Sequence, residues 1–342
     1  MVAMKITRVL RLLGAFAALA PTAGAEAGQR LDNVRARGFV TCGILPVVAG
    51  FATLSAKDGA RGMDVDICRA VAAAIFGNPG KVKYVEARNV AQLRTSDDID
   101  LVARRITWSL TRATGNGLMF GPITFYDGQG FMVPKKSGIT SAKQLDGKPV
   151  CVQAVEAHAT SVTTYFKASG LKLTAVRIDD DVAAERALTE GTCAAFSADT
   201  SWLGAARAGM AGGAAAYDIL PELISKEPLA PLVRQGDDQF FEIVRWSIFA
   251  QIAAEEYGIS SQNIDTPGAH EDLEAQQFLG RAPGNGAALG LSEHWAYDVV
   301  KNVGNYGEMF ERNVGSKSPI KLERGLNRLW TDGGLMYAPR LR

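Results

Sequence analysis

A cluster of guanidinium and hydroxyl side chains directly follows a short apolar run in the first third of the chain. The apolar run is residues 101–103, and the polar side chains after it are Arg104, Arg105, Thr107, Ser109, Thr111 and Arg112. Open α/β sheets bind ligands in the crevice beyond the carboxyl ends of their strands. A guanidinium can hold a carboxylate through two parallel hydrogen bonds. This stretch predicts the floor of a site for a small anion; the alternative is a solvated basic loop in which Thr107 or Ser109 only caps a helix.

The chain also carries six long motifs that follow one another in a fixed order. Two read GMDVDICRAVAAAIFG at residues 62–77 and DLVARRITWSLTR at residues 100–112, and the others lie at residues 125–133, 224–238, 303–315 and 333–342. Together they resemble the periplasmic general L-amino-acid-binding proteins of ABC importers. The resemblance implies a two-lobe periplasmic-binding-protein fold of type II. Each lobe is then an α/β unit with a mixed, mostly parallel sheet flanked by helices, and additional helices follow at the C-terminus.

The same resemblance implies a function. It implies a receptor without enzymatic activity that captures an L-amino acid in the cleft between the lobes and delivers it to a membrane permease. The runner-up is an enzyme on the same scaffold, such as a periplasmic dehydratase, with Arg112 and Arg105 gripping carboxylates and Glu156 or His158 as general acid. Against it, the sequence does not show any acid and base to be adjacent in the fold, and the long motifs follow the transporter branch. A third alternative is a receptor's ligand-sensing module, but no segment after the lobes reads as a spanning helix or a signalling domain.

Four residues take binding roles from the resemblance. Arg112 is expected to pair with the α-carboxylate of the ligand, and Thr107 to donate a hydroxyl hydrogen bond. Arg104 stands at a position that the general amino-acid binders also fill with arginine. Asp199 matches the acid that receives the α-ammonium group. A zwitterionic ligand needs a guanidinium for its carboxylate and a carboxylate for its ammonium group, on opposite sides of the binding cleft. Two lobes can supply these two sides. The alternative for Asp199 is an N-cap on a helix beginning at residue 201.

Two departures from the family pattern bear on the ligand. Arg105 stands where the family usually has an amide or a small polar residue, which adds a positive charge beside Arg104. Residues 154–158 read AVEAH where a Ser-Gly-Thr-Thr type of turn normally completes the carboxylate site. An ion pair between Arg105 and Glu156 across the cleft would compensate, and it would favour an unusual amino acid or another carboxylate. The alternative is that Arg105 points to solvent and His158 is a surface residue.

Composition sets broad limits on the partners. A chain of 342 residues with 47% hydrophobic residues has the size of two domain-sized units. Its 37 basic and 36 acidic residues give no reason to expect nucleic acid or an anionic membrane surface as a partner. Phosphate-binding glycine loops and metalloprotease motifs are absent from the sequence, and its three histidines are scattered. We therefore expect no cofactor and no metal. Separately, we expect a monomer.

The N-terminus has the pattern of a secretory signal. Lys5, Arg8 and Arg11 precede the apolar residues 12–20, and an Ala-Gly-Ala sequence ends at Ala25. The alternative is a membrane anchor, but the apolar run is far shorter than the roughly 20 residues that span a bilayer. We expect cleavage after Ala25 and export to the periplasm, with residues 1–25 as the signal peptide.

The elements that must position the site alternate between strand and helix patterns. This alternation predicts a doubly wound sheet in each lobe. The first lobe comprises residues 26–125 and the second residues 126–225, while residues 226–342 return to the first lobe and form a C-terminal helical extension. Residues 125–130 carry glycines that can absorb rotation between the lobes. Expected first-lobe elements are a helix at 31–38, a strand at 39–44, a helix at 64–76, a strand at 81–85, a helical turn at 90–95 and a strand at 99–103.

The second lobe repeats the pattern without detectable sequence repetition. Its expected strands lie at 131–134, 149–153, 173–178 and 193–197, and its expected helices at 141–145, 159–169 and 181–190. In the return segment, residues 239–257 predict a long amphipathic helix whose Trp246 and Phe249 belong to the core. Residues 266–285 are expected to be irregular in part, and residues 294–302 and 320–330 to be helices packing on the first lobe.

Four cysteines in an exported protein permit disulfides, and four allow three connectivities. We expect Cys42 to pair with Cys68 and Cys151 with Cys193, because each pair then falls inside one lobe of the implied fold. The alternative is four buried free thiols.

Overall fold

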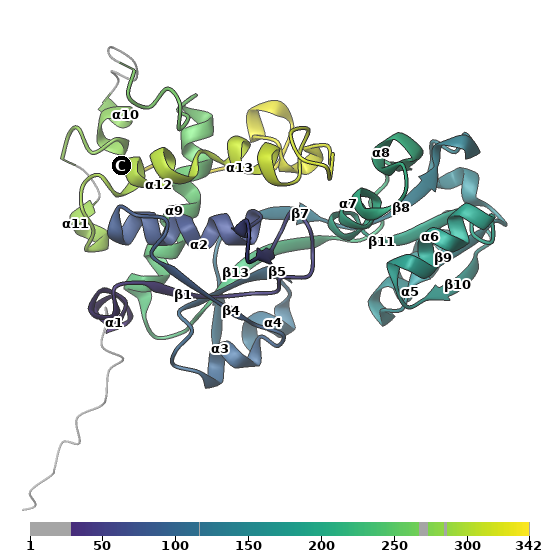
Figure 1. The fold of residues 1–342 in the computed structure, drawn as a ribbon, viewed down its shortest axis with the longest axis horizontal. Helices are drawn as coiled ribbons and strands as arrows, with labels where there is room; N and C mark the ends of the chain where they lie inside the picture. The colour runs from purple at the N-terminus through teal and green to yellow at the C-terminus, as the bar shows by residue number, and fades with distance from the viewer. Residues whose placement is uncertain (1–28, 116, 267–272, 284–285, 342) are drawn as a thin grey trace, which may run out of the picture.

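The structure is a computed structural model that describes residues 29–115, 117–266, 273–283 and 286–341. The expected signal peptide lies outside these residues. Figure 1 shows two α/β lobes, each built around one sheet and joined by crossing segments. Within the described ranges, none of the helices combines the length and the apolar character needed to cross a membrane.

The first lobe contains a six-stranded mixed sheet. Its order is β4-β1-β5-β13-β6, and β7 also pairs with β13. β1, β4 and β5 are parallel to one another, whereas β13 runs antiparallel to β5, β6 and β7. The strands are β1 (Val40–Ile44), β4 (Val82–Glu86), β5 (Leu101–Thr107), β6 (Leu118–Phe120), β7 (Phe125–Asp127) and β13 (Glu227–Arg234).

Helices cover this sheet on both faces. α2 (Met63–Phe76) and α9 (Asp238–Glu256) bury apolar faces in one core with Leu101 and Ala103, whereas Val102 and Ile106 belong to a second core with Leu93 of α3. A small hairpin that the sequence did not predict precedes α2. Further elements are α1 (Gln29–Arg37), β2 (Thr53–Ser55), β3 (Gly59–Arg61), α3 (Ala91–Thr95) and α4 (Leu110–Thr114).

The second lobe has a five-stranded sheet of order β10-β9-β11-β8-β12. β9, β10 and β11 are parallel, and β8 is antiparallel to β11 and β12. Its strands are β8 (Gln129–Pro134), β9 (Pro149–Gln153), β10 (Thr174–Ile178), β11 (Ala195–Asp199) and β12 (Tyr217–Ile219). Its helices are α5 (Glu156–Ala168), α6 (Asp181–Glu190), α7 (Thr200–Gly209) and α8 (Gly213–Ala216), with short 3-10 turns at Lys135–Ser137 and Ala142–Leu145.

The two crossings between the lobes lie side by side. The backbone N–H of Ile224 donates to the carbonyl oxygen of Gln129 over 2.8 Å, which joins the outgoing and returning segments. A Cβ at Gly128 would lie 2.6 Å from the carbonyl oxygen of Ser225, so only glycine fits this close approach. The glycine-bearing segment is thus packed between the lobes, at the place where a hinge is needed.

Strand β5 is longer than expected and bulged. The prediction that it ends at residue 103 is wrong, because it continues through Arg104 and Arg105 to Thr107. Val102 pairs with Leu232 and Ile106 with Ala230, so three residues of β5 face Pro231 alone. Proline has no N–H to give to the ladder, which favours a bulge here. Arg105 accordingly has a positive φ of 53°.

The C-terminal segment departs most from expectation. A helix at residues 320–330 was predicted, but this stretch has only the short 3-10 turn at Gly325–Asn327, and a second turn (Trp330–Asp332) begins at its last residue. The guanidinium of Arg207, in α7, donates to the carbonyl oxygens of Ile320 at 2.7 Å and Lys321 at 2.9 Å. These carbonyl oxygens accept hydrogen bonds from a side chain of the second lobe, so this part of the segment is extended rather than helical. The helices before it are α10 (Leu273–Phe278), α11 (Gly286–Leu289), α12 (Trp295–Val303) and α13 (Tyr306–Asn313).

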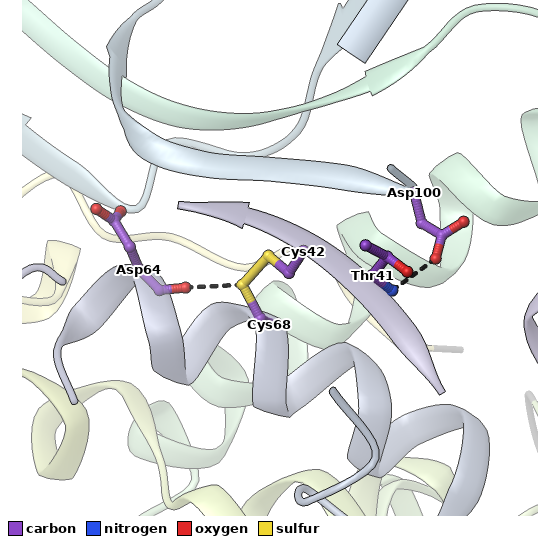
Figure 2. Close-up of a disulfide and its surroundings, with 5 residues drawn as sticks. All are labelled: Thr41, Cys42, Asp64, Cys68 and Asp100. Atoms are coloured by element: carbon purple, nitrogen blue, oxygen red, sulfur yellow. Dashed lines mark hydrogen bonds between the residues drawn. A yellow bond between two sulfur atoms is a disulfide. The ribbon is translucent and has the colours of Figure 1, made fainter. Parts of the chain in front are cut away.

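Both expected disulfides are present. Cys42 of β1 is bonded to Cys68 of α2, and Cys151 of β9 is bonded to Cys193 just before β11. The alternative of four free thiols is therefore wrong. The first bond fastens α2 to strand β1 of the first sheet (Figure 2). The second joins β9 to the segment that leads into its neighbour β11 in the second sheet.

Candidate ligand-binding site

A cavity of about 390 Å³ opens between the end of β5 and the end of β11. It brings together five of the six ligand-binding residues that the sequence predicts. The side chains that line it are Arg88, Asn89, Val90, Arg104, Arg105, Ile106, Thr107, Arg112 and Asp199. All but Asp199 come from the first lobe, so the cavity lies between the lobes.

Arg112 is held at the start of a short helix. Ser109 caps α4 by accepting a hydrogen bond from the backbone N–H of Arg112 over 3.4 Å. The guanidinium of Arg112 donates to the carbonyl oxygen of Thr107 over 3.0 Å. The capping role considered for Ser109 is therefore correct, and it fixes the backbone from which Arg112 reaches the cavity.

Thr107 already has an acceptor for its hydroxyl proton. Its Oγ1 donates to Oε2 of Glu227 over 2.7 Å. Ser225 donates to Oε1 of the same carboxylate over 3.1 Å, and accepts from the backbone N–H of Gln129 over 3.0 Å. This chain of hydrogen bonds links the floor of the cavity to both crossings between the lobes. A ligand that receives the Thr107 proton must therefore compete with Glu227.

Arg105 bridges the two lobes. Its Nη1 donates to Oγ of Ser201 over 2.9 Å. Its guanidinium carbon lies 5.3 Å from the ring centre of Phe51 and 5.7 Å from that of Trp202, within the range of cation–π attraction. Arg105 thus points neither to solvent nor to Glu156, and the expected pair with Glu156 is not formed. Glu156 is exposed at the start of α5 and does not line the cavity.

Asp199 is paired with His158. The Oδ1 of Asp199 lies 3.0 Å from Nε2 of the imidazole. His158 is only 9% exposed, so the alternative that placed it on the surface is wrong. The Asp199 side chain does not cap α7; Asp127 does so, accepting from the hydroxyl of Thr200 at 2.6 Å and the N–H of Ser201 at 3.2 Å. The carboxylate of Asp199 is therefore free of a capping role and faces the cavity.

Two buried acids and one half-buried arginine around the site have shifted pKa values. Burial raises the pKa of Asp64 to about 7, against the opposing effects of Arg105 and Arg104. Burial and then the negative charge of Asp199 raise the pKa of Asp127. Burial and then the positive charge of Arg105 lower the pKa of Arg104. The site therefore combines closely spaced cations with carboxyl groups that resist ionisation.

Asp100, the first residue of the motif around the arginines, serves the fold. It is 2% exposed and accepts a hydrogen bond from the backbone N–H of Thr41 over 2.7 Å (Figure 2). Arg37 and Arg30 form ion pairs with it. It anchors the start of β5 to β1, away from the cavity.

A family model for bacterial extracellular solute-binding proteins, family 3, matches residues 40–263. The chain belongs to this family. The solute-binding protein is 45% identical to the putative amino-acid ABC transporter-binding protein YhdW of Escherichia coli K12, over 99% of this chain and 100% of YhdW. It is 43% identical to the general L-amino acid-binding periplasmic protein AapJ of Rhizobium johnstonii, over 95% of this chain and 96% of AapJ.

A solved structure agrees with the fold. A periplasmic binding protein of an ABC transporter from Brucella ovis, with glutathione bound, is 42% identical to the solute-binding protein and gives a TM-score of 0.79. The match covers 91% of this chain and 99% of the Brucella chain. Together these relatives establish the two-lobe solute-binding fold, and they place the protein in a family of receptors rather than enzymes. The family assignment excludes the alternative of a periplasmic dehydratase.

Several residues of the site were not predicted. Glu227 lies 120 residues from Thr107, and Ser201 lies 96 residues from Arg105. Arg88 lines the cavity from the loop after β4. The sequence offered one usable signal, Pro231 inside an apolar run, which marks the bulge that exposes Arg104 and Arg105.

Proposed function

We propose that this solute-binding protein captures an L-amino acid in the cavity between its lobes and delivers it to the permease of an ABC importer. The observation that carries the proposal is the placement of Arg112 and Asp199 on different lobes around one cavity. These groups match the two charges of an α-amino acid, and closure of the lobes would strengthen both ion pairs by excluding water. The names of YhdW and AapJ support the same class of ligand.

The remaining expectations belong to this proposal. Residues 26–125 and 226–342 would form one lobe and residues 126–225 the other. The strands of the two sheets support this division, except that β7 pairs with β13 and extends the first sheet to Asp127. Export to the periplasm would follow cleavage of residues 1–25, a location that the family description supports. A monomer remains the expected oligomeric state.

A second candidate ligand is a small peptide such as glutathione. The bound glutathione of the Brucella relative favours it. A further cavity of about 290 Å³, lined by Trp202, Met210 and Val48 among others, lies beyond Arg105. A ligand longer than an amino acid would reach this cavity if Arg105 released Ser201.

A thermal-shift screen of residues 26–342 tests the proposal. The ligands are the common L-amino acids, glutathione, dicarboxylates, 2-oxo acids and prephenate. A ligand at 100 times its dissociation constant stabilises the folded state by about 2.7 kcal/mol. We expect stabilisation by one or more L-amino acids, with the ligand recovered unchanged. Stabilisation by non-amino acids alone would refute the proposal.

The Asp199→Asn variant should distinguish ligands by their ammonium group. We expect affinity for an α-amino acid to fall about tenfold or more, because a charged hydrogen bond contributes about 1.5–3 kcal/mol. The 2-oxo analogue of the same amino acid should lose little. Titration calorimetry with both ligands measures this difference.

The matched control is Asp218→Asn, which alters an exposed acid of the same lobe that pairs with Lys135 at 3.4 Å. It should bind both ligands like the unaltered protein. Equal losses for the two ligands in Asp199→Asn would show that Asp199 does not bind the ammonium group.

A further inference from the structure

Two cavities lie on either side of the bridge that Arg105 makes between the lobes. The first is the proposed ligand cavity of about 390 Å³, which Arg105 itself lines. The second has a volume of about 290 Å³ and is lined from both lobes, by Val48 of the first and by Trp202 and Met210 of the second, among others. The ring of Trp202 also packs against the guanidinium of Arg105. The side chain of Arg105 therefore separates the space for an amino acid from a further, partly apolar space.

The groups that receive the Arg105 side chain are held in place by the fold. Phe51 and Ser201 are buried. The indole N–H of Trp202 donates to the carboxylate of Asp181 over 2.7 Å. Arg105 itself is a long side chain held at its tip by one hydrogen bond and two ring contacts. In the partition between the two cavities, Arg105 is thus the part that can move.

The backbone of Arg105 directs this side chain across the cleft. Its φ of 53° lies in the left-handed region, which residues with a Cβ rarely adopt. Arg105 lies in the bulge that β5 forms opposite Pro231. Bulges beside binding sites commonly change the direction in which a side chain points. Here the redirected side chain is the one that stands between the two cavities.

We infer that Arg105 is a specificity-determining residue that limits the ligand to a single amino acid. A longer ligand must displace the guanidinium from Ser201 and from the rings of Phe51 and Trp202 before its distal part can enter the second cavity. This displacement breaks a charged hydrogen bond and two cation–π contacts within the protein. The excluded class comprises γ-glutamyl peptides, glutathione among them, and amino acids with extended side-chain amides.

This inference rests on the proposed function, since it assumes that the α-amino acid group of the ligand binds at Arg112 and Asp199. It goes further by assigning the residue that sets the length of the ligand. Arg105 acts here by occupying space and by its contacts within the protein, and it binds no charge of the ligand.

Titration calorimetry with L-glutamine and γ-L-glutamyl-p-nitroanilide tests the inference. Both ligands carry the same α-amino acid group and the same net charge, and the anilide extends the side-chain amide by an uncharged aromatic ring. The unaltered protein should bind the anilide at least about tenfold more weakly than L-glutamine, in line with the loss of one charged hydrogen bond. Arg105→Asn should bind the anilide at least about tenfold more tightly than the unaltered protein does, with no comparable gain for L-glutamine. Asparagine suits this position because it tolerates the left-handed backbone.

Two further variants keep the result interpretable. Arg105→Lys retains a long side chain that can donate to Ser201, and it should still disfavour the anilide. Arg61→Gln removes an exposed arginine of the same lobe that pairs with Asp58, and should bind both ligands like the unaltered protein. A purely structural role for Arg105 would weaken both ligands equally in Arg105→Asn.

Two outcomes would overturn the inference while leaving amino-acid capture intact. One is an affinity for the anilide that Arg105→Asn leaves unchanged or lowers. The other is an unaltered protein that binds the anilide as tightly as L-glutamine. Failure of every L-amino acid to bind would instead refute the proposed function, and this inference with it.

Discussion

The Arg112→Ala variant is expected to lose about 2–5 kcal/mol of binding free energy for any carboxylate ligand, roughly 30-fold to several thousand-fold in Kd. The loss is large because the α-carboxylate would remain in a closed site without its guanidinium partner. Titration calorimetry with the best-stabilising L-amino acid measures the change. A melting curve establishes that the variant is folded, since Arg112 also bonds the backbone of Thr107.

Arg112→Lys provides the matched comparison. Lysine keeps the positive charge but lacks the planar fork that holds a carboxylate through two hydrogen bonds. We expect an affinity between those of the unaltered protein and Arg112→Ala. An unchanged Kd in the alanine variant would remove Arg112 from the ligand site.

The second large effect concerns the buried carboxyl group of Asp64, near the disulfide between β1 and α2 (Figure 2). Burial raises its pKa from 3.8 to about 7. Between about pH 4 and pH 7 the unfolded chain therefore loses this proton while the folded protein keeps it. The free energy of unfolding consequently falls as the pH rises through this window, by up to about 4 kcal/mol at 1.36 kcal/mol per pKa unit.

The Asp64→Asn variant should remove this contribution, because the amide does not ionise. Urea denaturation at pH 4.5 and pH 7.5 would compare the two proteins. We expect the free energy of unfolding of Asp64→Asn to rise, relative to that of the unaltered protein, from the lower pH to the higher. An identical pH dependence would mean that Asp64 ionises normally in the folded state.

Local patterns predicted most of the regular elements. The strand at 149–153 and the helix at 181–190 have the expected bounds, because hydrophobic periodicity and a terminal Gly191 agree there. Strand β5 was predicted too short, because two consecutive arginines resemble a loop in the sequence. The bulge opposite Pro231, which keeps them in the strand, is visible only in the structure. The prediction of a helix at residues 320–330 was wrong for a similar reason. Its backbone carbonyls bond Arg207, a contact across more than 100 residues that no local pattern contains.

In the candidate site, too, residues close together in the sequence were predicted, whereas contacts between distant residues were not. Arg104, Arg105, Thr107 and Arg112 were found together because they lie on one strand and the helix after it. Their partners were not found, since Glu227 reaches Thr107 only after the chain has passed through the second lobe and returned. Glu156 was chosen from its position in an altered turn, but α5 begins at this residue and leaves it exposed.

The most direct measurement is a crystal structure of residues 26–342 with the L-amino acid that stabilises the protein most. We expect an intact ligand between the lobes, with its α-carboxylate on the guanidinium of Arg112 and its ammonium group within hydrogen-bond distance of Asp199. A ligand bound instead in the cavity around Trp202, or with its carboxylate away from Arg112, would contradict the proposed mode of capture.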